Sequence, residues 1–152
     1  MTKEAFVGYI EEYSAMMYRV AISILRNEED CRDALQDAVL KAWEKRGTLK
    51  NEDSFRPWLM RIVVNNCHNA LRGRKRLVSI DEIPEPSIPP PDPALSDALQ
   101  SLPEGLRLPL VLVYSEGMSY AEAAQVLRIP TGALRGRIHR AKQQLRKELH
   151  EE

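Results

Sequence analysis

The 152-residue chain has few cysteines and no long apolar segment. Its two cysteines, Cys31 and Cys67, form no C-x-x-C pair and lie near no paired histidines, which argues against a disulfide framework or a zinc site. The apolar runs are far shorter than the roughly 20 residues of a membrane span, and the first residues lack the apolar core of a signal peptide. We therefore expect a cytoplasmic protein that does not insert into a membrane.

The sequence patterns of common enzymes are also missing. No Ser-His-Asp pattern, phosphate-binding P-loop or Gly-x-Gly-x-x-Gly segment occurs, and we find no catalytic constellation. Alternating runs of β-branched residues are absent too, so no part of the chain has the pattern of a strand. These absences predict an all-α protein that is not an enzyme and that needs no cofactor or metal.

Proline, in contrast, is concentrated in one place. Six of the ten prolines lie within residues 84–93. Because proline donates no backbone hydrogen bond and has a fixed φ, such a segment favours an extended, polyproline-like chain. We therefore expect two small helical domains, residues 1–80 and 94–152, joined by a proline-rich linker at residues 81–93.

The first domain has the apolar spacing of three helices. Residues 6–24 repeat apolar side chains every three or four positions, as one face of a long helix does. A second helix should begin after Asn27, a good N-cap followed by acids, and end at Gly47. A third should start near Ser54 with Pro57 in its permissive first turn.

The second domain has the pattern of a helix-turn-helix. The segment Ser119-Tyr-Ala-Glu122 has the spacing of a capping box, and Pro130 follows a short turn. The last helix carries an apolar stripe, with most of its basic residues outside that stripe. The stripe consists of Leu134, Ile138, Ala141, Leu145 and Leu149. In a helix-turn-helix the second helix enters the major groove, where arginines can read guanine edges.

Charge is balanced overall but strongly sorted along the chain. The 22 basic and 22 acidic residues cancel, yet residues 54–80 hold six bases and residues 128–147 seven, with no acid in either block. Acids gather instead in residues 28–37. A solvated helix would normally pair acids with bases one turn apart, so the acid-free blocks favour contact with nucleic acid. Asparagines and a histidine at residues 65–69 are poor core residues but good partners for base edges.

Three motifs resemble segments of the sigma-70 family of RNA polymerase sigma factors. Residues 30–43 are similar to the D-x-x-D-x-x-Q-[DE] helix, ending in an aromatic residue, that these factors place against the polymerase core. Residues 55–66 and 71–76 resemble the promoter-melting helix. Three further segments resemble the −35-reading domain, namely residues 102–107, 117–122 and 130–142. With no further domain, the chain is similar to the short extracytoplasmic-function (ECF) group of alternative sigma factors.

This resemblance implies a factor that binds core RNA polymerase and directs promoter recognition, −10 melting and transcription initiation. It implies three sets of site residues. The core-binding set is Asp30, Asp33, Gln36, Asp37 and Trp43. The −10 set is Trp58, Asn65, Asn66, His68, Asn69, Arg72, Arg74, Lys75 and Arg76. The −35 set is Arg135, Arg137, His139, Arg140 and Lys142. Because family members are commonly held by an anti-sigma factor, often membrane-anchored, such a partner is expected as well.

Two other functions would use part of these features. A helix-turn-helix repressor or activator would share the second domain, but it should add a ligand pocket or a dimerisation helix. A purely protein-binding helical adaptor would explain the acidic helix but not thirteen bases in two acid-free blocks. Copurification with core polymerase distinguishes these alternatives.

Overall fold

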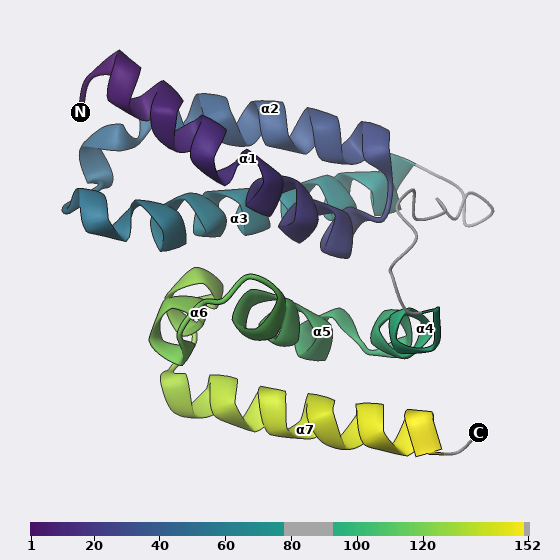
Figure 1. Ribbon diagram of the computed structural model, residues 1–152. Coiled ribbons are helices and arrows are strands. Elements are labelled where there is room, and N and C mark those ends of the chain that lie inside the picture. Colours follow the sequence, from purple (N-terminus) through teal and green to yellow (C-terminus); the bar gives the residue numbers. More distant parts are fainter. Residues whose placement is uncertain (78–92, 151–152) are drawn as a thin grey trace. The chain divides into compact units, whose positions relative to one another are not determined.

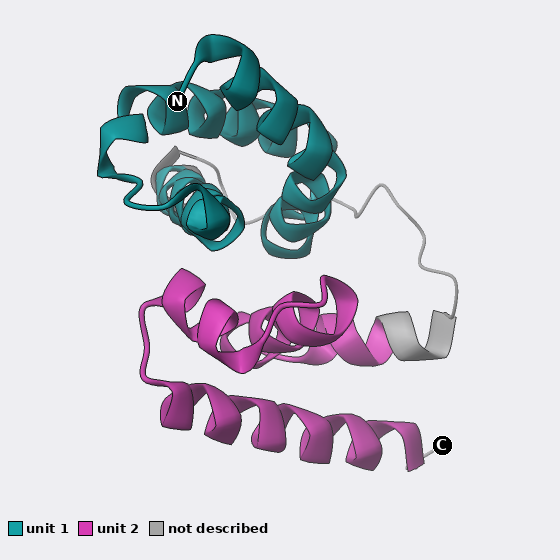
Figure 2. Cartoon of the chain, turned by 60° about the vertical axis from the view of Figure 1, so that its left-hand side comes forward, with its two compact units in different colours: residues 1–86 teal, residues 87–152 magenta. Residues whose placement is uncertain are grey.

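The computed structural model describes residues 1–77 and 93–150, and for residues 74–77 and 93–96 it describes the backbone alone. Every regular element in these residues is a helix or a helical turn, which confirms the all-α prediction (Figure 1). The chain divides into two compact units, Met1–Pro86 and Ser87–Glu152 (Figure 2). Except for Pro93, the predicted linker lies outside the described residues.

Unit 1 consists of three long helices that pack on one another. These are α1 (Lys3–Leu25), α2 (Glu28–Glu44) and α3 (Phe55–Leu77). Two short 3₁₀ turns, η1 (Arg46–Thr48) and η2 (Glu52–Ser54), connect α2 to α3. The prediction that Gly47 ends the second helix is wrong by one turn, because α2 already ends at Glu44 and Gly47 lies within η1.

The ends of these helices follow from local chemistry. Arg26 takes a left-handed φ of 57° and donates its backbone N–H to the Ile22 carbonyl at 3.0 Å, which closes α1. Asn27 then caps α2, as predicted, because its Oδ1 accepts the N–H of Asp30 at 2.9 Å. The chain therefore reverses direction between α1 and α2 within two residues.

The core of unit 1 combines large side chains on α1 and α3 with small ones on α2. The buried residues of α2 are Cys31, Ala34, Ala38 and Ala42. Their small size lets the other two helices approach α2 closely. Phe55, at the start of α3, is fully buried and contacts aromatic rings of α1, with its ring centroid 4.5 Å from that of Tyr9 in a stacked arrangement. The Tyr9 hydroxyl also donates to Glu52 Oε2 at 3.1 Å, and this hydrogen bond raises the pKa of Tyr9.

Unit 2 is built from α4 (Pro93–Ser101), α5 (Glu104–Leu110), the π-helical turn η3 (Val111–Ser115), α6 (Tyr120–Leu127) and α7 (Thr131–His150). Pro109 cannot donate within α5, and the chain continues directly after it with the wider π-helical hydrogen bonds. The predicted helix-turn-helix is present as α6 and α7 with the short turn between them. Its core includes Leu134, Ile138 and Ala141 from α7, whereas Leu149, in the last turns of α7, is 43% exposed.

The connection before the helix-turn-helix also follows the sequence. Gly117 has a φ of 71°, a conformation that favours glycine, and it lets the chain turn after η3. Ser119 Oγ then accepts the Glu122 N–H at 3.0 Å while Glu122 Oε1 accepts the Ser119 N–H at 3.2 Å. This reciprocal capping box starts α6 at the predicted position.

Candidate functional site

The exposed face of α2 carries most of the core-binding set. Asp33, Gln36 and Asp37 are exposed, and Leu40, which the sequence analysis missed, is 62% exposed beside them. These four residues are spaced i, i+3, i+4 and i+7, so they share one face of the helix. Asp30 is half-buried in the first turn of α2, where its negative charge interacts favourably with the helix dipole. An acidic surface with an apolar side chain on it suits a partner that is basic and partly apolar.

Trp43, the fifth member of the core-binding set, is half-buried and makes its contacts within unit 1. Its ring lies edge-on to Phe6 with the centroids 5.1 Å apart. The Arg46 guanidinium lies 3.7 Å from the centroid of the same ring, and Arg46 Nη1 donates to the Trp43 carbonyl at 2.6 Å. These contacts give Trp43 a structural role at the end of α2, beside the exposed acidic face.

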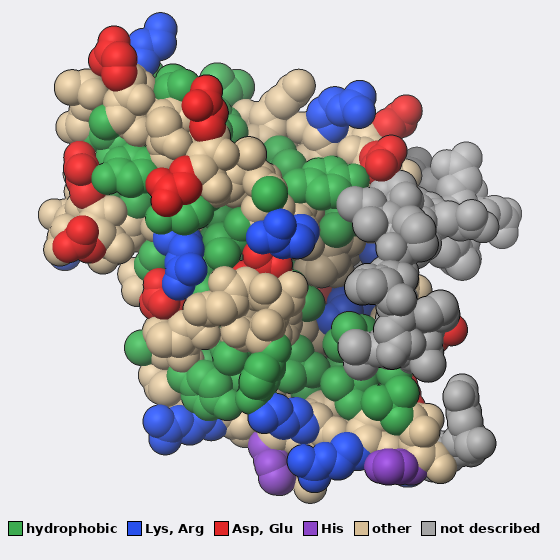
Figure 3. Space-filling view, in the orientation of Figure 1, with side chains coloured by type: hydrophobic (Ala, Val, Ile, Leu, Met, Phe, Trp, Pro, Cys, Tyr) green, Lys and Arg blue, Asp and Glu red, His purple; other side chains and the backbone are tan. Residues whose placement is uncertain are grey.

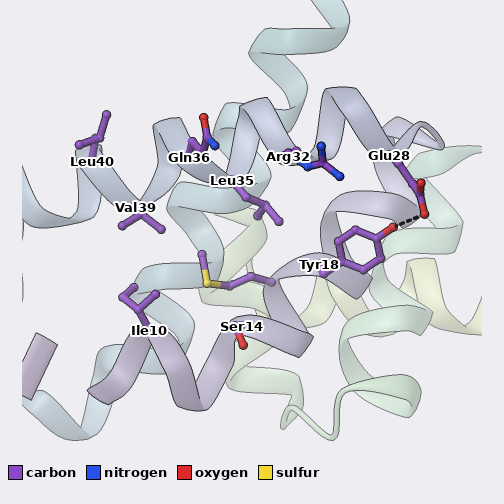
Figure 4. A pocket seen from close by; sticks show the side chains of 10 residues that line it. Ile10, Ser14, Tyr18, Glu28, Arg32, Leu35, Gln36, Val39 and Leu40 are labelled. Atoms are coloured by element: carbon purple, nitrogen blue, oxygen red, sulfur yellow. Dashed lines mark hydrogen bonds between the residues drawn. The ribbon is translucent and has the colours of Figure 1, made fainter. Parts of the chain in front are cut away.

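An apolar groove of about 780 Å³ lies between α1 and α2 (Figure 4). Leu35 and Val39 of α2 point toward α1 in the figure, and Gln36 and Leu40 line the groove as well as belonging to the exposed face. Tyr18 donates to Glu28 Oε1 at 3.4 Å at the groove wall. The groove was not predicted from the sequence, because an unfilled space between two helices depends on how they pack. The signal that could have indicated it is Leu40, an apolar residue seven positions after Asp33 and therefore on the same face of the predicted helix.

The exposed face of α3 carries part of the −10 set. Asn65, Asn69 and Arg72 are exposed, and Arg72 donates to the Asn69 side chain. Trp58 lies seven residues before Asn65 and is therefore on the same side of the helix; it is half-buried, and its Nε1 donates to Thr48 Oγ1 at 3.1 Å. His68 is half-buried. The side chains of the remaining members, Arg74, Lys75 and Arg76, lie outside the described residues, although α3 continues through these positions.

Asn66 differs from the prediction for the −10 set. It is only 5% exposed, and its side chain is occupied by contacts inside unit 1. Lys41 Nζ donates to Asn66 Oδ1 at 2.7 Å, and Asn66 Nδ2 donates to the Ala34 carbonyl at 3.3 Å. We therefore correct this assignment, because an asparagine that joins α2 to α3 cannot meet an unpaired base without breaking these contacts.

The −35 set lies along α7, where Lys, Arg and His side chains gather in the space-filling view (Figure 3). Arg135, His139 and Arg140 are exposed, and Arg137 is half-buried. Lys142 is also half-buried, and its Nζ lies 4.5 Å from the centroid of the Tyr114 ring. Residues 131–147 of α7 thus carry basic side chains and no acidic one.

Within residues 1–77 and 93–150, no helix is long and apolar enough to cross a membrane. The side chains described there also form no group of three or more histidines, cysteines and carboxylates that could hold a metal ion.

Two family models match most of the chain. Residues 9–77 match sigma-70 region 2, and residues 93–145 match sigma-70 region 4. The chain is 31% identical to the ECF RNA polymerase sigma factor SigM of Mycobacterium tuberculosis, covering 93% of this chain and 75% of SigM. It is 29% identical to the RNA polymerase sigma-H factor of Pseudomonas aeruginosa, covering 97% and 87%. The sigma factor RpoE of Bartonella quintana, solved in complex with the anti-sigma factor NepR, has a similar fold. Its TM-score is 0.79 at 23% identity, covering 97% of this chain and 98% of the matched chain.

Proposed function

The chain belongs to the ECF group of sigma-70 RNA polymerase sigma factors, and from this premise we propose how its surfaces divide the work of initiation. Its function is that of an alternative sigma factor, a non-enzymatic protein that directs transcription initiation at promoters. The matched regions lie in both units, whereas a repressor would account for the second unit alone and an adaptor for the acidic helix alone.

We assign core docking and −10 opening to residues 1–80, and −35 recognition to residues 94–152. Residues 81–93 connect the two. The limits of the matched regions, residues 9–77 and 93–145, support this division.

Core RNA polymerase docks, in this proposal, on the exposed face of α2. Asp33, Gln36 and Asp37 supply charge and hydrogen-bonding groups, and Leu40 with the neighbouring groove supplies apolar contact. An interface that combines a buried apolar centre with charged surroundings gives both affinity and orientation. Asp30 and Trp43 stabilise α2 at its two ends. The negative charge of Asp30 interacts favourably with the helix dipole in the first turn, and Trp43 packs on Phe6 near the last turn.

Opening of the −10 region is assigned to the exposed face of α3. Asn65 and Asn69 can hydrogen-bond the edges of unpaired bases, and Arg72 can hold a phosphate. His68 flanks this face, Trp58 continues it toward the helix start, and Arg74, Lys75 and Arg76 extend the basic sequence beyond it. Capturing unstacked bases offsets the few kcal/mol that unpairing costs, so a protein without ATP can favour melted DNA.

Recognition of the −35 element is assigned to α7. Arg135 and Arg137 lie near the start of the helix that follows the turn, which is the end that meets base edges in a helix-turn-helix. His139 and Arg140 follow on the same helix and are exposed, so we assign them to contacts with the groove or its phosphates. Lys142, the last member of the set, has a different environment, because its Nζ lies beside the Tyr114 ring.

We further propose that the protein acts in the cytoplasm, where the polymerase is, and that an anti-sigma factor regulates it. The fold shared with RpoE, a sigma factor solved together with its anti-sigma factor, supports this expectation. The apolar groove beside the core-binding face is a surface where such a factor could compete with polymerase.

One observation carries the proposal for unit 1. A single three-helix unit presents an exposed acidic face on α2 and an exposed acid-free face with asparagines and arginine on α3. Such a unit can hold a protein partner and a DNA strand at the same time.

The test combines binding with transcription. The tagged full chain should copurify with core polymerase subunits and should support run-off transcription from promoters that core enzyme alone does not use. Alanine at Asn65 should reduce permanganate reactivity of the −10 region more than it reduces closed-complex formation. Equal loss in both steps would contradict the −10 assignment, and failure to copurify would contradict the docking assignment.

A further inference from the structure

Two tyrosines of unit 2 lie against cations on one flank of α7. Tyr114, in η3, is 56% exposed, and Tyr120 is the first residue of α6. The Arg135 guanidinium carbon lies 5.9 Å from the centroid of the Tyr120 ring, and Lys142 Nζ lies 4.5 Å from that of Tyr114. Both distances fall within the range of cation–π attraction. Since Arg135 and Lys142 are seven residues apart, they occupy the same side of α7, two turns from each other.

The two tyrosines also influence each other's ionisation. Hydrogen bonding from Lys142, and then from Tyr120, lowers the pKa of Tyr114. Hydrogen bonding to Tyr114 raises the pKa of Tyr120. Two ring–cation contacts, Tyr114 with Lys142 and Tyr120 with Arg135, therefore join α7 to the two elements before it.

The two cations are held in different ways. Lys142 carries a point charge, and its Nζ lies 4.5 Å from the centroid of the Tyr114 ring. A guanidinium that lies over a ring keeps its N–H donors free in its own plane, so Arg135 can be held by Tyr120 and still donate to a guanine. By contrast, Arg140 and Lys147, also seven residues apart, are exposed elsewhere around α7.

From this geometry we infer that Tyr120 is a positioning residue that orients Arg135 for −35 base reading, and that Lys142 is held by Tyr114 instead of contacting DNA. The inference rests on the proposed −35 function of α7. Holding the guanidinium before DNA arrives reduces the side-chain entropy lost on binding, which is how preorganisation improves affinity for the matched base. Lys142 accordingly leaves the −35 set and becomes part of the support of α7.

The first experiment measures closed-complex binding by holoenzyme, assembled from core polymerase and the full chain, on promoters with single base changes in the −35 element. The variants are Arg135→Ala, Tyr120→Leu and Tyr120→Phe. Tyr120→Leu should lower discrimination about two- to fivefold, the size of an exposed cation–π contact, at the same base pair where Arg135→Ala does. Tyr120→Phe keeps the ring and should preserve discrimination, and neither Tyr120 variant should change the slope of log K against log salt.

The second experiment compares Lys142→Met with Lys147→Met in the same assay. Removal of a phosphate contact lowers the salt slope by about one, so Lys147→Met should do this if Lys147 faces phosphate, while Lys142→Met should leave the slope unchanged. Thermal melting of each variant separates lost folding from lost binding.

Several results would overturn the inference. The first is that Tyr120→Leu discriminates among −35 base changes as well as the wild type does. The second is that Tyr120→Leu loses the same affinity for every promoter sequence. The third is that Lys142→Met reduces the salt slope. If the wild-type holoenzyme tolerates every −35 base change, −35 reading itself is refuted and the inference falls with it. If Arg135→Ala loses discrimination and Tyr120→Leu does not, only the positioning role fails.

Discussion

The neighbouring residues Asn65 and Asn66 provide the sharpest test of the assignments in unit 1, because the same substitution should impair DNA opening at one position and stability at the other. Asn66→Ala removes the hydrogen bond from Lys41 at 2.7 Å and the one to the Ala34 carbonyl at 3.3 Å. A hydrogen bond to a charged group contributes about 1.5–3 kcal/mol and a neutral one about 0.5–1.5 kcal/mol. Lys41 is half-buried and regains water, and alanine favours the helix, so we expect a net loss of about 2 kcal/mol.

That loss has a measurable size. For a domain of 60–100 residues it corresponds to a fall in Tm of roughly 8–16 °C. Asn65→Ala is the matched control, because Asn65 is exposed on the same helix and its removal should change stability by less than about 0.5 kcal/mol. Asn65→Ala should instead impair −10 opening in holoenzyme.

The assay is thermal and urea unfolding of the full chain followed by circular dichroism, together with permanganate footprinting of holoenzyme. Footprinting is done at a temperature where both variants are folded. The structural role of Asn66 would be refuted by a Tm within about 2 °C of the wild type. It would also be refuted if Asn65→Ala destabilised unit 1 as much as Asn66→Ala does.

Three further predictions concern the other surfaces. Alanine at Asp33, Gln36 and Asp37 together should weaken copurification with core polymerase without changing helix content, because all three are exposed. Alanine at the exposed Glu11 and Glu12 of α1 is the control. Undiminished capture of core polymerase by the triple variant would contradict the docking assignment. Arg135→Ala or Arg137→Ala should lower the binding free energy by about 1–3 kcal/mol at one −35 base pair. Arg146→Ala or Lys147→Ala should instead weaken binding to all sequences alike and lower the salt slope by about one. The same pattern for all four variants would argue against base reading by α7. In a spectrophotometric titration of phenolate, Tyr114 should ionise at lower pH than an ordinary tyrosine, and Lys142→Met should reduce the shift because the interaction with Lys142 is its largest cause. Between that lowered pKa and the ordinary value near 10, Tyr114 in the unfolded chain binds more protons than Tyr114 in the native protein, so this contact stabilises the fold increasingly as pH rises. Identical titrations of the wild type and Lys142→Met would contradict the contact.

Features that depend on neighbours along the chain were predicted correctly. The Asn27 cap and the Ser119–Glu122 capping box are contacts across three residues, so the side chain and the backbone group that it satisfies are close in any helical start. The all-α class and the helix-turn-helix also follow from periodicity, which reports the face that each helix buries. The error at Gly47 is of another kind, because a 3₁₀ turn between the end of α2 and the glycine is not visible in the pattern.

The roles of individual polar and cationic residues depended on which helices meet. Asn65 and Asn66 are the same residue type one position apart, and only the packing of α3 on α2, made close by small side chains such as Ala34, places Asn66 between the helices. In the sequence, Lys142 is one of several basic residues of α7, and only the packing of η3 against α7 places Tyr114 beside it.

By itself, the sequence determined the helical class, the helix starts, the sorting of charge and the sigma-factor motifs, because each of these is a local or one-dimensional property. The tertiary structure decided which members of the site sets face solvent, that Trp43 packs on Phe6, and that a groove opens between α1 and α2. Such outcomes depend on distances between residues far apart in the chain. A rotation of one helix by a single residue, about 100°, would exchange an exposed asparagine for a buried one.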